Sequence, residues 1–269
     1  MRFLSVALCL LAAVLASPVS AQEKSPQGAK GAVASPAVPA WLAPYAPVAQ
    51  KLIATTKDAG GGFAWDRLAM LTDTYGPRLS GSMNLEAALR WARDEMQKDG
   101  LDNVRLEPVM VPQWVRGEES LEILEPVPNK VPLLGLGGSV GTREEGVAGE
   151  LLVVKSFDDL TARASEARGR IVLFNVPYTN YGETVRYRSG GASAATKVGA
   201  VAALVRAVGP PGLRTPHTGG MSYQKDLPKI PTAAIPTEDA DRFDRMAKRG
   251  QKVTLRLRMN ARFMDDAPS

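Results

Sequence analysis

Hydrophobic positions between residues 45 and 100 recur at intervals of three or four residues, which predicts amphipathic helices in this part of the chain. The first predicted helix begins near Val48 and ends at the three glycines 60–62. The second carries Trp65 and ends where Gly76 is followed by a proline. Both therefore have a clear stop signal.

A third helix is predicted by five apolar residues that share one helical face: Leu85, Ala88, Leu89, Ala92 and Met96. Ser82 or Asn84 can cap its beginning, because their side chains accept hydrogen bonds from free backbone N–H groups. Gly100 suits the position after its end, where a left-handed residue is common.

From residue 104 onward the pattern changes to short apolar runs and strict alternation, which indicate strands. The predicted strands are 104–111, 121–124, 151–154, 171–174, 200–205, 232–235 and 253–259. Predicted helices lie between them: one that Ser156 opens and Gly169 ends, one at 192–197, and one that Thr237 caps and Gly250 ends. This order predicts a compact mixed α/β module with some antiparallel sheet. A long polar loop, 209–229, interrupts it.

The first 21 residues have the features of a secretory signal peptide. Arg2 precedes the apolar run 3–16, and Val19-Ser20-Ala21 fits the small-x-small cleavage rule. A membrane anchor is the alternative, but the run is shorter than the ~20 apolar residues that a span needs, and Pro18 follows it. The chain is therefore expected to be exported, to the periplasm or out of the cell, with no membrane association after cleavage.

Composition narrows the possible chemistry of the exported chain. Cys9, the only cysteine, lies inside the predicted signal peptide, so no disulfide or thiolate chemistry is expected after cleavage. Residues 22–44 are rich in Pro, Ala, Gly and Ser, which predicts a flexible leader.

The net charge is +5, but the 33 Lys and Arg residues are interspersed with 28 Asp and Glu, and aromatic residues make up 6%. We therefore expect no nucleic-acid partner.

A hydrolytic metal site needs several His, Asp and Glu ligands that converge on the ion. His217 is the only histidine. Four pairs of adjacent acids are present: Glu118-Glu119, Glu144-Glu145, Asp158-Asp159 and Asp265-Asp266. Adjacent side chains point to different faces of a strand or helix, so all four pairs are predicted to be solvated surface charge. No metal ligand is expected within this chain.

A serine hydrolase is the competing possibility, because Gly137–Gly141 fits the G-x-S-x-G pattern around Ser139. An acid and then His217 follow in the required order, and the candidate acids are Asp158, Asp159 and Glu166. The pattern lies in a glycine-dense loop, however, and Gly146 and Gly149 disfavour the helix that should follow the serine.

Two other motifs have weaker functional interpretations. Arg186, Tyr187 and Arg188 form V-R-Y-R, which could bind a carboxylate through a guanidinium group, although a polar helix face is the favoured interpretation. His217 by itself is expected to be a loop residue bonded to nearby backbone. No phosphate-binding loop is present in the sequence.

Several sequence blocks resemble one family. The run W-D-R-L-A-M-L-T-D-T-Y-G-P-R-L-S-G-S at 65–82 is followed in order by L-G-L-G-G-S-V-G-T, V-R-Y-R-S-G-G-A and P-H-T-G. Together these blocks resemble the N-terminal part of the carboxypeptidase Q family, and the resemblance extends from about residue 62 to residue 260.

The resemblance implies a secreted exopeptidase that hydrolyses short peptides, especially dipeptides, and that is similar to enzymes acting as homodimers. It also implies an α/β fold with an α/β/α peptidase domain that binds two zinc ions. A mixed α/β protease-associated (PA) domain interrupts that peptidase domain. By this resemblance residues 45–120 begin the peptidase domain, 121–260 form the PA-like domain, and 261–269 lead on to the catalytic part.

The family's zinc ligands and catalytic glutamate are expected after the PA domain, in segments resembling H-x-D, D-D-G-G and E-E. No position of this sequence corresponds to these segments, and Asp265-Asp266 lacks the following glycines. The resemblance therefore assigns no catalytic and no metal residue here, and the chain is expected to be catalytically incomplete. A stand-alone, non-enzymatic module that binds peptides or proteins is the alternative.

Overall fold

The computed structural model describes residues 39–58 and 62–269. The chain divides into two compact units, residues 1–63 and 64–269. The predicted signal peptide and most of the leader predicted at 22–44 lie outside the described residues. None of the described helices has both the length and the apolar composition needed to cross a bilayer.

The described part of the first unit is helical. A 3-10 helix, η1 (Ala40–Tyr45), occupies the last leader residues and runs directly into α1 (Ala46–Asp58). The first predicted helix is thus confirmed. Its apolar residues Val48, Leu52 and Ile53 are all more than half exposed.

Helices α2 (Gly62–Tyr75) and α3 (Met83–Lys98) begin the second unit and confirm the other two predicted helices. Ser82 is the N-cap of α3, and its Oγ accepts a hydrogen bond from Leu85 N at 3.2 Å. Gly100, at φ +77°, follows the end of α3 in the left-handed region. Arg67 of α2 forms ion pairs with α3 and the residue that caps it, Glu95 at 3.2 Å and Asp99 at 2.5 Å.

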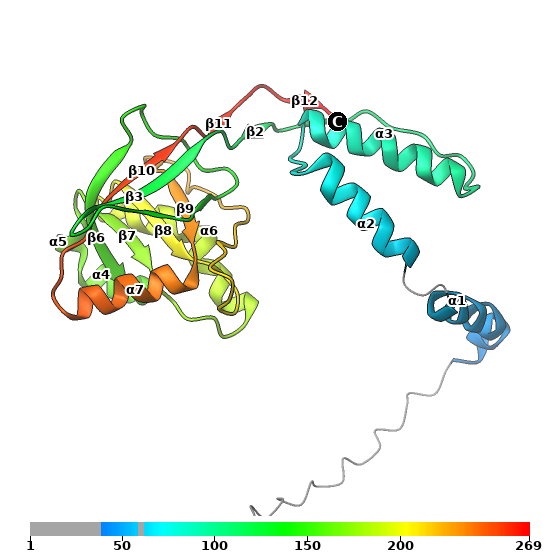
Figure 1. Ribbon diagram of the computed structural model, residues 1–269, viewed down its shortest axis with the longest axis horizontal. Coiled ribbons are helices and arrows are strands. Elements are labelled where there is room, and N and C mark those ends of the chain that lie inside the picture. The colour runs from blue at the N-terminus through cyan, green and yellow to red at the C-terminus, as the bar shows by residue number, and fades with distance from the viewer. Residues whose placement is uncertain (1–38, 59–61) are drawn as a thin grey trace, which may run out of the picture. The chain divides into compact units, whose positions relative to one another are not determined.

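An eight-stranded mixed sheet forms the centre of the α/β module (Figure 1). Its strands are β3 (Glu119–Glu125), β4 (Asn129–Val131), β5 (Leu134–Gly135), β6 (Val147–Val154), β7 (Ile171–Phe174), β8 (Ala202–Arg206), β9 (Thr232–Ile235) and β10 (Thr254–Met259). They lie in the order β4-β3-β10-β6-β7-β8-β9-β5. Strands β6 to β9 are parallel, and all other neighbours are antiparallel. The predicted mixed α/β fold is confirmed.

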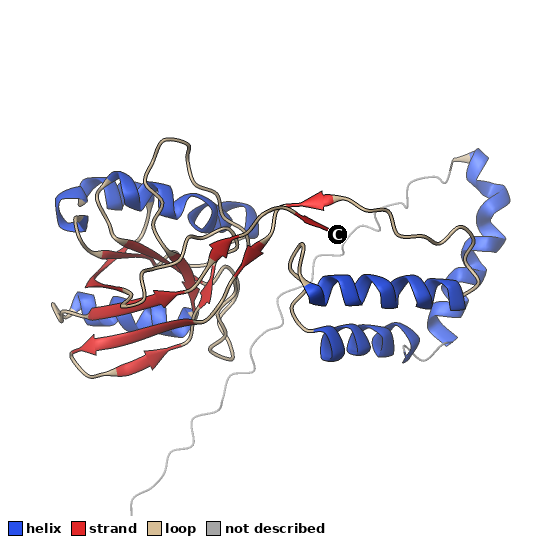
Figure 2. Ribbon diagram, turned by 90° about the horizontal axis from the view of Figure 1, so that it is seen from above, coloured by secondary structure: helices blue, strands red, loops and turns tan. Residues whose placement is uncertain are grey.

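Helices cover both faces of this sheet (Figure 2). They are α4 (Phe157–Ala162), α5 (Ala164–Ala167), α6 (Tyr181–Lys197) and α7 (Thr237–Lys248). Residues of α7 share one buried cluster with Leu173 and Leu204, whereas residues of α4, α5 and α6 share the other with Phe174 and Val205. Successive strand residues thus enter opposite layers, as the pleat of a strand requires.

Two short strand pairs join the chain where it enters and leaves the module. Strand β2 (Trp114–Val115) pairs with β11 (Arg262–Phe263), and β1 (Met110–Val111) pairs with β12 (Ala267–Pro268). Both pairs are antiparallel, so the two connections run side by side.

Four local predictions were wrong or incomplete. The single helix predicted between Ser156 and Gly169 is two short helices, α4 and α5, which meet at Arg163. Helix α6 is far longer than the predicted 192–197. Its first part was missed because Gly191 weakens the helical pattern of the sequence. Glycine is needed there, since a Cβ at this position would lie 3.1 Å from the Phe174 ring. Thr237 does not cap α7. Pro236 is the N-cap, and the Thr237 hydroxyl donates to Glu238 at 2.9 Å instead. Within the predicted strand 104–111, only Met110–Val111 is a strand.

Strand β8 provides a test of the core. Leu204 is fully buried, whereas Leu213 in the long loop is 97% exposed. We expect Leu204→Ala to lower the free energy of unfolding by about 2–5 kcal/mol, because it leaves a cavity between α7 and the sheet. The matched control Leu213→Ala is expected to stay within ~0.5 kcal/mol of the unaltered chain. Urea unfolding followed by circular dichroism measures both, and equal losses would contradict this account of the core.

Candidate functional site

Ser139 and His217 lie in two loops that are bonded to each other, and Arg188 packs against the second loop. We call residues 136–142 and 217–223 the paired loops. Gly137 N donates to Gly219 O at 2.9 Å, and Met221 N donates back to Gly137 O at 3.0 Å. This isolated pairing holds the loops in register beside strands β5 and β9.

The glycines of the first loop serve close packing. A Cβ on Gly141 would lie 2.6 Å from the carbonyl oxygens of both Met259 and Ala261, so only glycine fits against that backbone. Gly138 adopts φ +90°, a backbone conformation that residues with a Cβ rarely adopt. The glycine density of G-x-S-x-G is therefore explained without a nucleophile.

Ser139 is fully buried and bonded to the backbone. Its Oγ accepts a hydrogen bond from Thr232 N at 2.8 Å and donates to Val140 O at 3.0 Å. Its carbonyl accepts from Trp114 Nε1 at 2.8 Å. No helix follows the serine, so the strand–turn–helix geometry of a serine hydrolase is not formed here.

The other members of the predicted serine triad are bonded elsewhere. His217 is exposed, and its Nδ1 donates to Val208 O. Asp159 accepts from Lys155 N at 2.7 Å, Glu166 pairs with Arg163 at 2.9 Å, and Asp158 is exposed. Within the described part of the chain, no hydrogen bond joins Ser139 to His217 or His217 to any of these acids.

The V-R-Y-R motif lies on α6, and its two arginines differ. Arg186 is exposed and lies over the Phe157 and Tyr187 rings, with Cζ 5.8 and 5.1 Å from their centroids. Arg188 is only 7% exposed, and its Nη2 donates to the Tyr181 hydroxyl at 2.6 Å.

The guanidinium of Arg188 packs against the second of the paired loops. A Cβ on Gly219 would lie 2.6 Å from Arg188 Cζ, and the Arg188 Nε is buried without a hydrogen-bond partner. Among the described residues no carboxylate forms an ion pair with this arginine. A buried cation without a counter-ion is unfavourable, so Arg188 is chemically suited to an anion such as a carboxylate.

A second polar cluster lies at the carboxyl ends of the parallel strands, and sequence reasoning missed it. Arg206, at the end of β8, donates to Asn175 Oδ1 at 2.9 Å and pairs with Asp241 of α7. Arg214 forms a two-point pair with the buried Asp239, with both distances 2.9 Å. Polar residues directly after apolar strands are the signal that could have found it. Because its groups are bonded to one another, the cluster fastens the long loop to α7.

The acidic pairs form no metal centre. The part of the chain that the structure describes holds no group of three or more His, Cys, Asp or Glu side chains placed to bind an ion. Glu118, Glu144, Glu145, Asp265 and Asp266 are exposed, as predicted for solvated charge.

Glu119 departs from that prediction. Its side chain is 10% exposed, and its two carboxylate oxygens accept from Gly135 N at 3.0 and 2.9 Å. Burial raises the pKa of the Glu119 carboxyl, and the bond from Gly135 and the Arg116 guanidinium, 3.7 Å away, oppose that rise. Glu118 lies just before β3 and is exposed, whereas Glu119 begins the strand and is covered. Alternation along a strand cannot show which of its two faces other residues cover.

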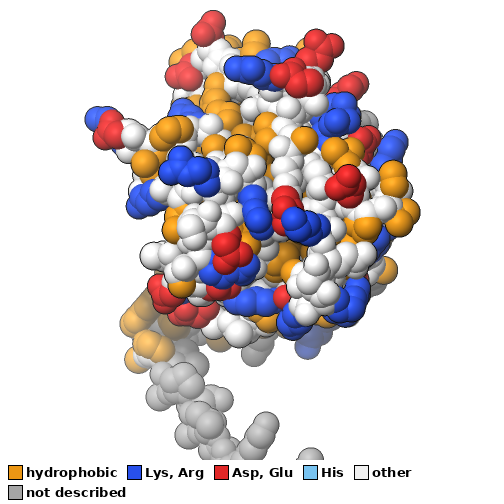
Figure 3. Space-filling view, turned by 90° about the vertical axis from the view of Figure 1, so that its left-hand side faces the viewer, with side chains coloured by type: hydrophobic (Ala, Val, Ile, Leu, Met, Phe, Trp, Pro, Cys, Tyr) orange, Lys and Arg blue, Asp and Glu red, His pale blue; other side chains and the backbone are white. Residues whose placement is uncertain are grey.

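Charge on the molecular surface is mixed. On the face of the molecule that Figure 3 shows, Lys and Arg side chains are interspersed with Asp and Glu and do not form one continuous basic area. A continuous basic area is the footprint expected of a protein that binds a phosphate backbone. This face therefore gives no support to a nucleic-acid partner.

Glu119 gives a pH-dependent prediction. Because the carboxyl has a higher pKa in the folded chain, its contribution to stability is present below the unfolded pKa of about 4.3 and is lost as pH rises through the folded value. We therefore expect the unaltered chain to lose stability relative to Glu119→Gln when the pH is raised from about 4 to 7. Urea unfolding across this range measures the difference. Glu118→Gln is the control for loss of a neighbouring carboxylate, and a Glu119→Gln profile parallel to that of the unaltered chain would contradict the assignment.

Comparison with known proteins identifies relatives among peptidases. No protein-family model matches the sequence. Carboxypeptidase Q of Homo sapiens is 53% identical over 206 residues, which cover 77% of this chain and 44% of the human protein. Carboxypeptidase Q of Bos taurus is 49% identical over 229 residues, which cover 85% of this chain and 48% of the bovine protein.

Solved structures give the same result. A peptidase M28 precursor from Shewanella amazonensis is 34% identical, with a TM-score of 0.72 over 77% of this chain and 49% of that chain. A zinc aminopeptidase from Bacillus subtilis shares the fold at 21% identity, with a TM-score of 0.51 over 76% of this chain and 45% of its own. The chain spans about half the length of the relatives it matches. Across that span it is a homologue of carboxypeptidase Q.

Proposed function

We propose that this chain is part of an exported, zinc-dependent exopeptidase that hydrolyses short peptides, dipeptides in particular. The observation that carries the proposal is the identity of about one half to carboxypeptidase Q. The likeness to the Shewanella amazonensis peptidase supports it, and zinc is proposed by extension from the Bacillus subtilis enzyme. The signal-like residues 1–21 support export, to the periplasm or out of the cell.

The proposal divides the chain by role. Residues 45–120 contribute the first helices of the peptidase domain, 121–260 form an inserted PA-like domain, and 261–269 return to the peptidase domain. The pairing of β1 with β12 and of β2 with β11 supports an insertion, because the chain leaves the module beside the point at which it entered.

Exposed apolar side chains support the assignment of α2 and α3 to a larger domain. Trp65 and Leu68 of α2 and Met83 of α3 are all more than half exposed. Apolar surface of this kind usually marks an interface. We propose that the peptidase domain covers it, and that the complete enzyme forms the homodimer that the family resemblance implies.

Zinc binding is not assigned to the described residues. They contain no cluster of His, Cys, Asp or Glu that fits a hydrolytic zinc site, which needs at least three protein ligands around an open position. We propose that two zinc ions and the catalytic carboxylate are held by the part of the complete enzyme that corresponds to the unmatched half of its relatives. By this proposal the chain alone is catalytically incomplete.

A chimaera tests the proposal. The chain replaces the matching part of human carboxypeptidase Q, and hydrolysis of unblocked dipeptides is measured beside zinc content. We expect the chimaera to hydrolyse dipeptides in a reaction that a chelator stops and zinc restores, because the human part supplies the metal ligands. The chain alone is expected to give the buffer rate and to retain no zinc.

Intact human carboxypeptidase Q is the control for the assay. A chimaera that folds and binds zinc but hydrolyses no dipeptide would contradict the proposal and favour a non-enzymatic binding module. Zinc-dependent hydrolysis by the chain alone would contradict its catalytic incompleteness.

A further inference from the structure

Strand β10 pairs with only the first half of β6, so one edge of the second half of β6 has no neighbouring strand. Strand β10 pairs with β6 from Val147 to Glu150, and a last hydrogen bond joins Leu151 N to Val253 O at 2.8 Å. Beyond that point no strand of the described residues follows this side of β6, whereas β7 continues to pair with its other side as far as Val154. An edge is therefore open in the middle of an eight-stranded sheet.

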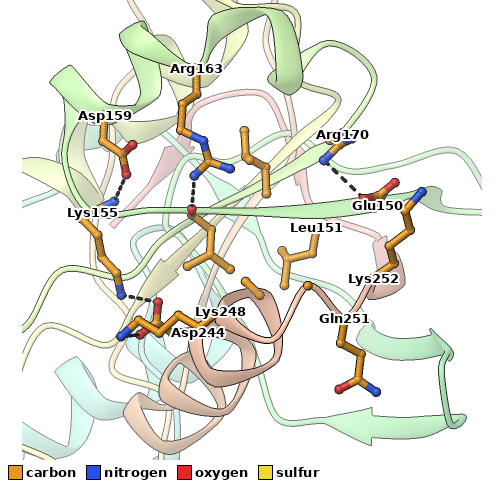
Figure 4. A pocket seen from close by; sticks show the side chains of 14 residues that line it. Glu150, Leu151, Lys155, Asp159, Arg163, Arg170, Asp244, Lys248, Gln251 and Lys252 are labelled. Atoms are coloured by element: carbon orange, nitrogen blue, oxygen red, sulfur yellow. Dashed lines mark hydrogen bonds and ion pairs between the residues drawn. The ribbon is translucent and has the colours of Figure 1, made fainter.

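The backbone groups of this edge can be assigned by alternation. Val154 O accepts from Asn175 N on the β7 side, so the even-numbered residues of β6 face β7 and Val153 faces the open side. Two side chains occupy part of that side (Figure 4): Arg163 Nη1 donates to Val153 O at 2.9 Å, and Asp159 Oδ2 accepts from Lys155 N at 2.7 Å. They supply the donor and the acceptor that a neighbouring strand would supply.

A cavity of about 410 Å³ runs along this edge. It lies between Asp159 of α4 and Arg163 on one side and the end of α7 on the other, with β6 at its base (Figure 4). The edge from Leu151 to Lys155 is about 13 Å long at 3.3 Å per residue. A short extended segment therefore matches the length of the edge.

The lining of the cavity is predominantly cationic. Five Lys or Arg side chains line it, against three Asp or Glu. Asp244 is already paired with Lys155 at 2.6 Å and with Lys248 at 2.9 Å. Lys252 also lines the cavity, is exposed, and forms no ion pair with the described residues. An acidic occupant would complement this charge.

We propose that the open edge of β6 binds an extended acidic segment of a partner polypeptide. The segment adds a strand beside Leu151–Lys155, and its backbone replaces the Arg163 and Asp159 side chains at β6. Arg163 stays paired with Glu166 through Nε and Nη2, both at 2.9 Å, so that only its Nη1 is released, and this group and Lys252 then bind the carboxylates of the segment. A second copy of this chain is disfavoured, because two such cationic edges repel each other. The proposal does not depend on the peptidase assignment.

A labelled peptide tests this site on the full chain. The probe is fluorescein-labelled Glu-Val-Glu-Val-Glu-Val, and its binding is followed by fluorescence anisotropy. We expect it to bind at least about tenfold more tightly than Lys-Val-Lys-Val-Lys-Val, which is a difference of ~1.4 kcal/mol. N-methylation of alternate residues of the acidic peptide is expected to weaken binding by at least about tenfold, because it removes the N–H groups that pair with β6.

Lys252→Glu is expected to weaken binding of the acidic peptide about tenfold by reversing one charge of the rim. The matched control is Lys130→Glu, an exposed lysine on β4, which is expected to leave binding unchanged. Hydrogen exchange of the Val153 amide, measured on the unaltered chain, is expected to slow when the peptide is bound.

Equal binding of the N-methylated peptide would overturn the proposal, since charge attraction alone would then explain the affinity. Self-association of the chain that Lys252→Glu abolishes would overturn the proposed occupant in favour of a second copy.

Discussion

The antiparallel pairing of β10 with both β3 and β6 is the constraint on which the rest of the module depends. Strand β10 comes last in the sheet and lies between the first long strand and the parallel set. Its residues Leu255 and Leu257 are fully buried. Because the last strand pairs with β3, the chain must leave the module where it entered, and the strand pairs β1–β12 and β2–β11 follow from that.

The extent of the same pairing also creates the edge at which we propose that a partner binds. Since β10 pairs with β6 only as far as Leu151, the second half of β6 has an open edge. On the opposite side of the parallel strands, the loops around Gly137 and Gly219 close over β9 and α6, with Arg188 beneath them. The open edge of β6 and the loops over Arg188 both lie where strands end. Neither of them depends on Ser139 or His217 as a catalytic group. An inserted module with two connections agrees with the proposed place of this chain in a peptidase.

Sequence patterns predicted correctly those elements in which one structural requirement alone determines the pattern of residues. Strands β7 and β9 were predicted at the residues where they occur, because β7 is an apolar run between Arg170 and Asn175 and β9 is bounded by Pro231 and Pro236. Helix α6 was largely missed, because Gly191 is needed against Phe174 and weakens the helical pattern. Among the site residues, the role of Ser139 depends on Thr232, 93 residues away, and the burial of Arg188 and Glu119 depends on loops that periodicity cannot place. The resemblance to carboxypeptidase Q came from local sequence blocks, which need no such long-range information.

We infer from these pairings that β10 closes residues 112–265 into a module that is stable on its own. The most direct test is urea unfolding of this excised segment, compared with residues 112–252, from which β10 is absent. We expect one cooperative transition for 112–265 and no cooperative transition for 112–252, because without β10 the pairing on both β3 and β6 is lost. Cooperative unfolding of 112–252, or its absence in 112–265, would contradict the account.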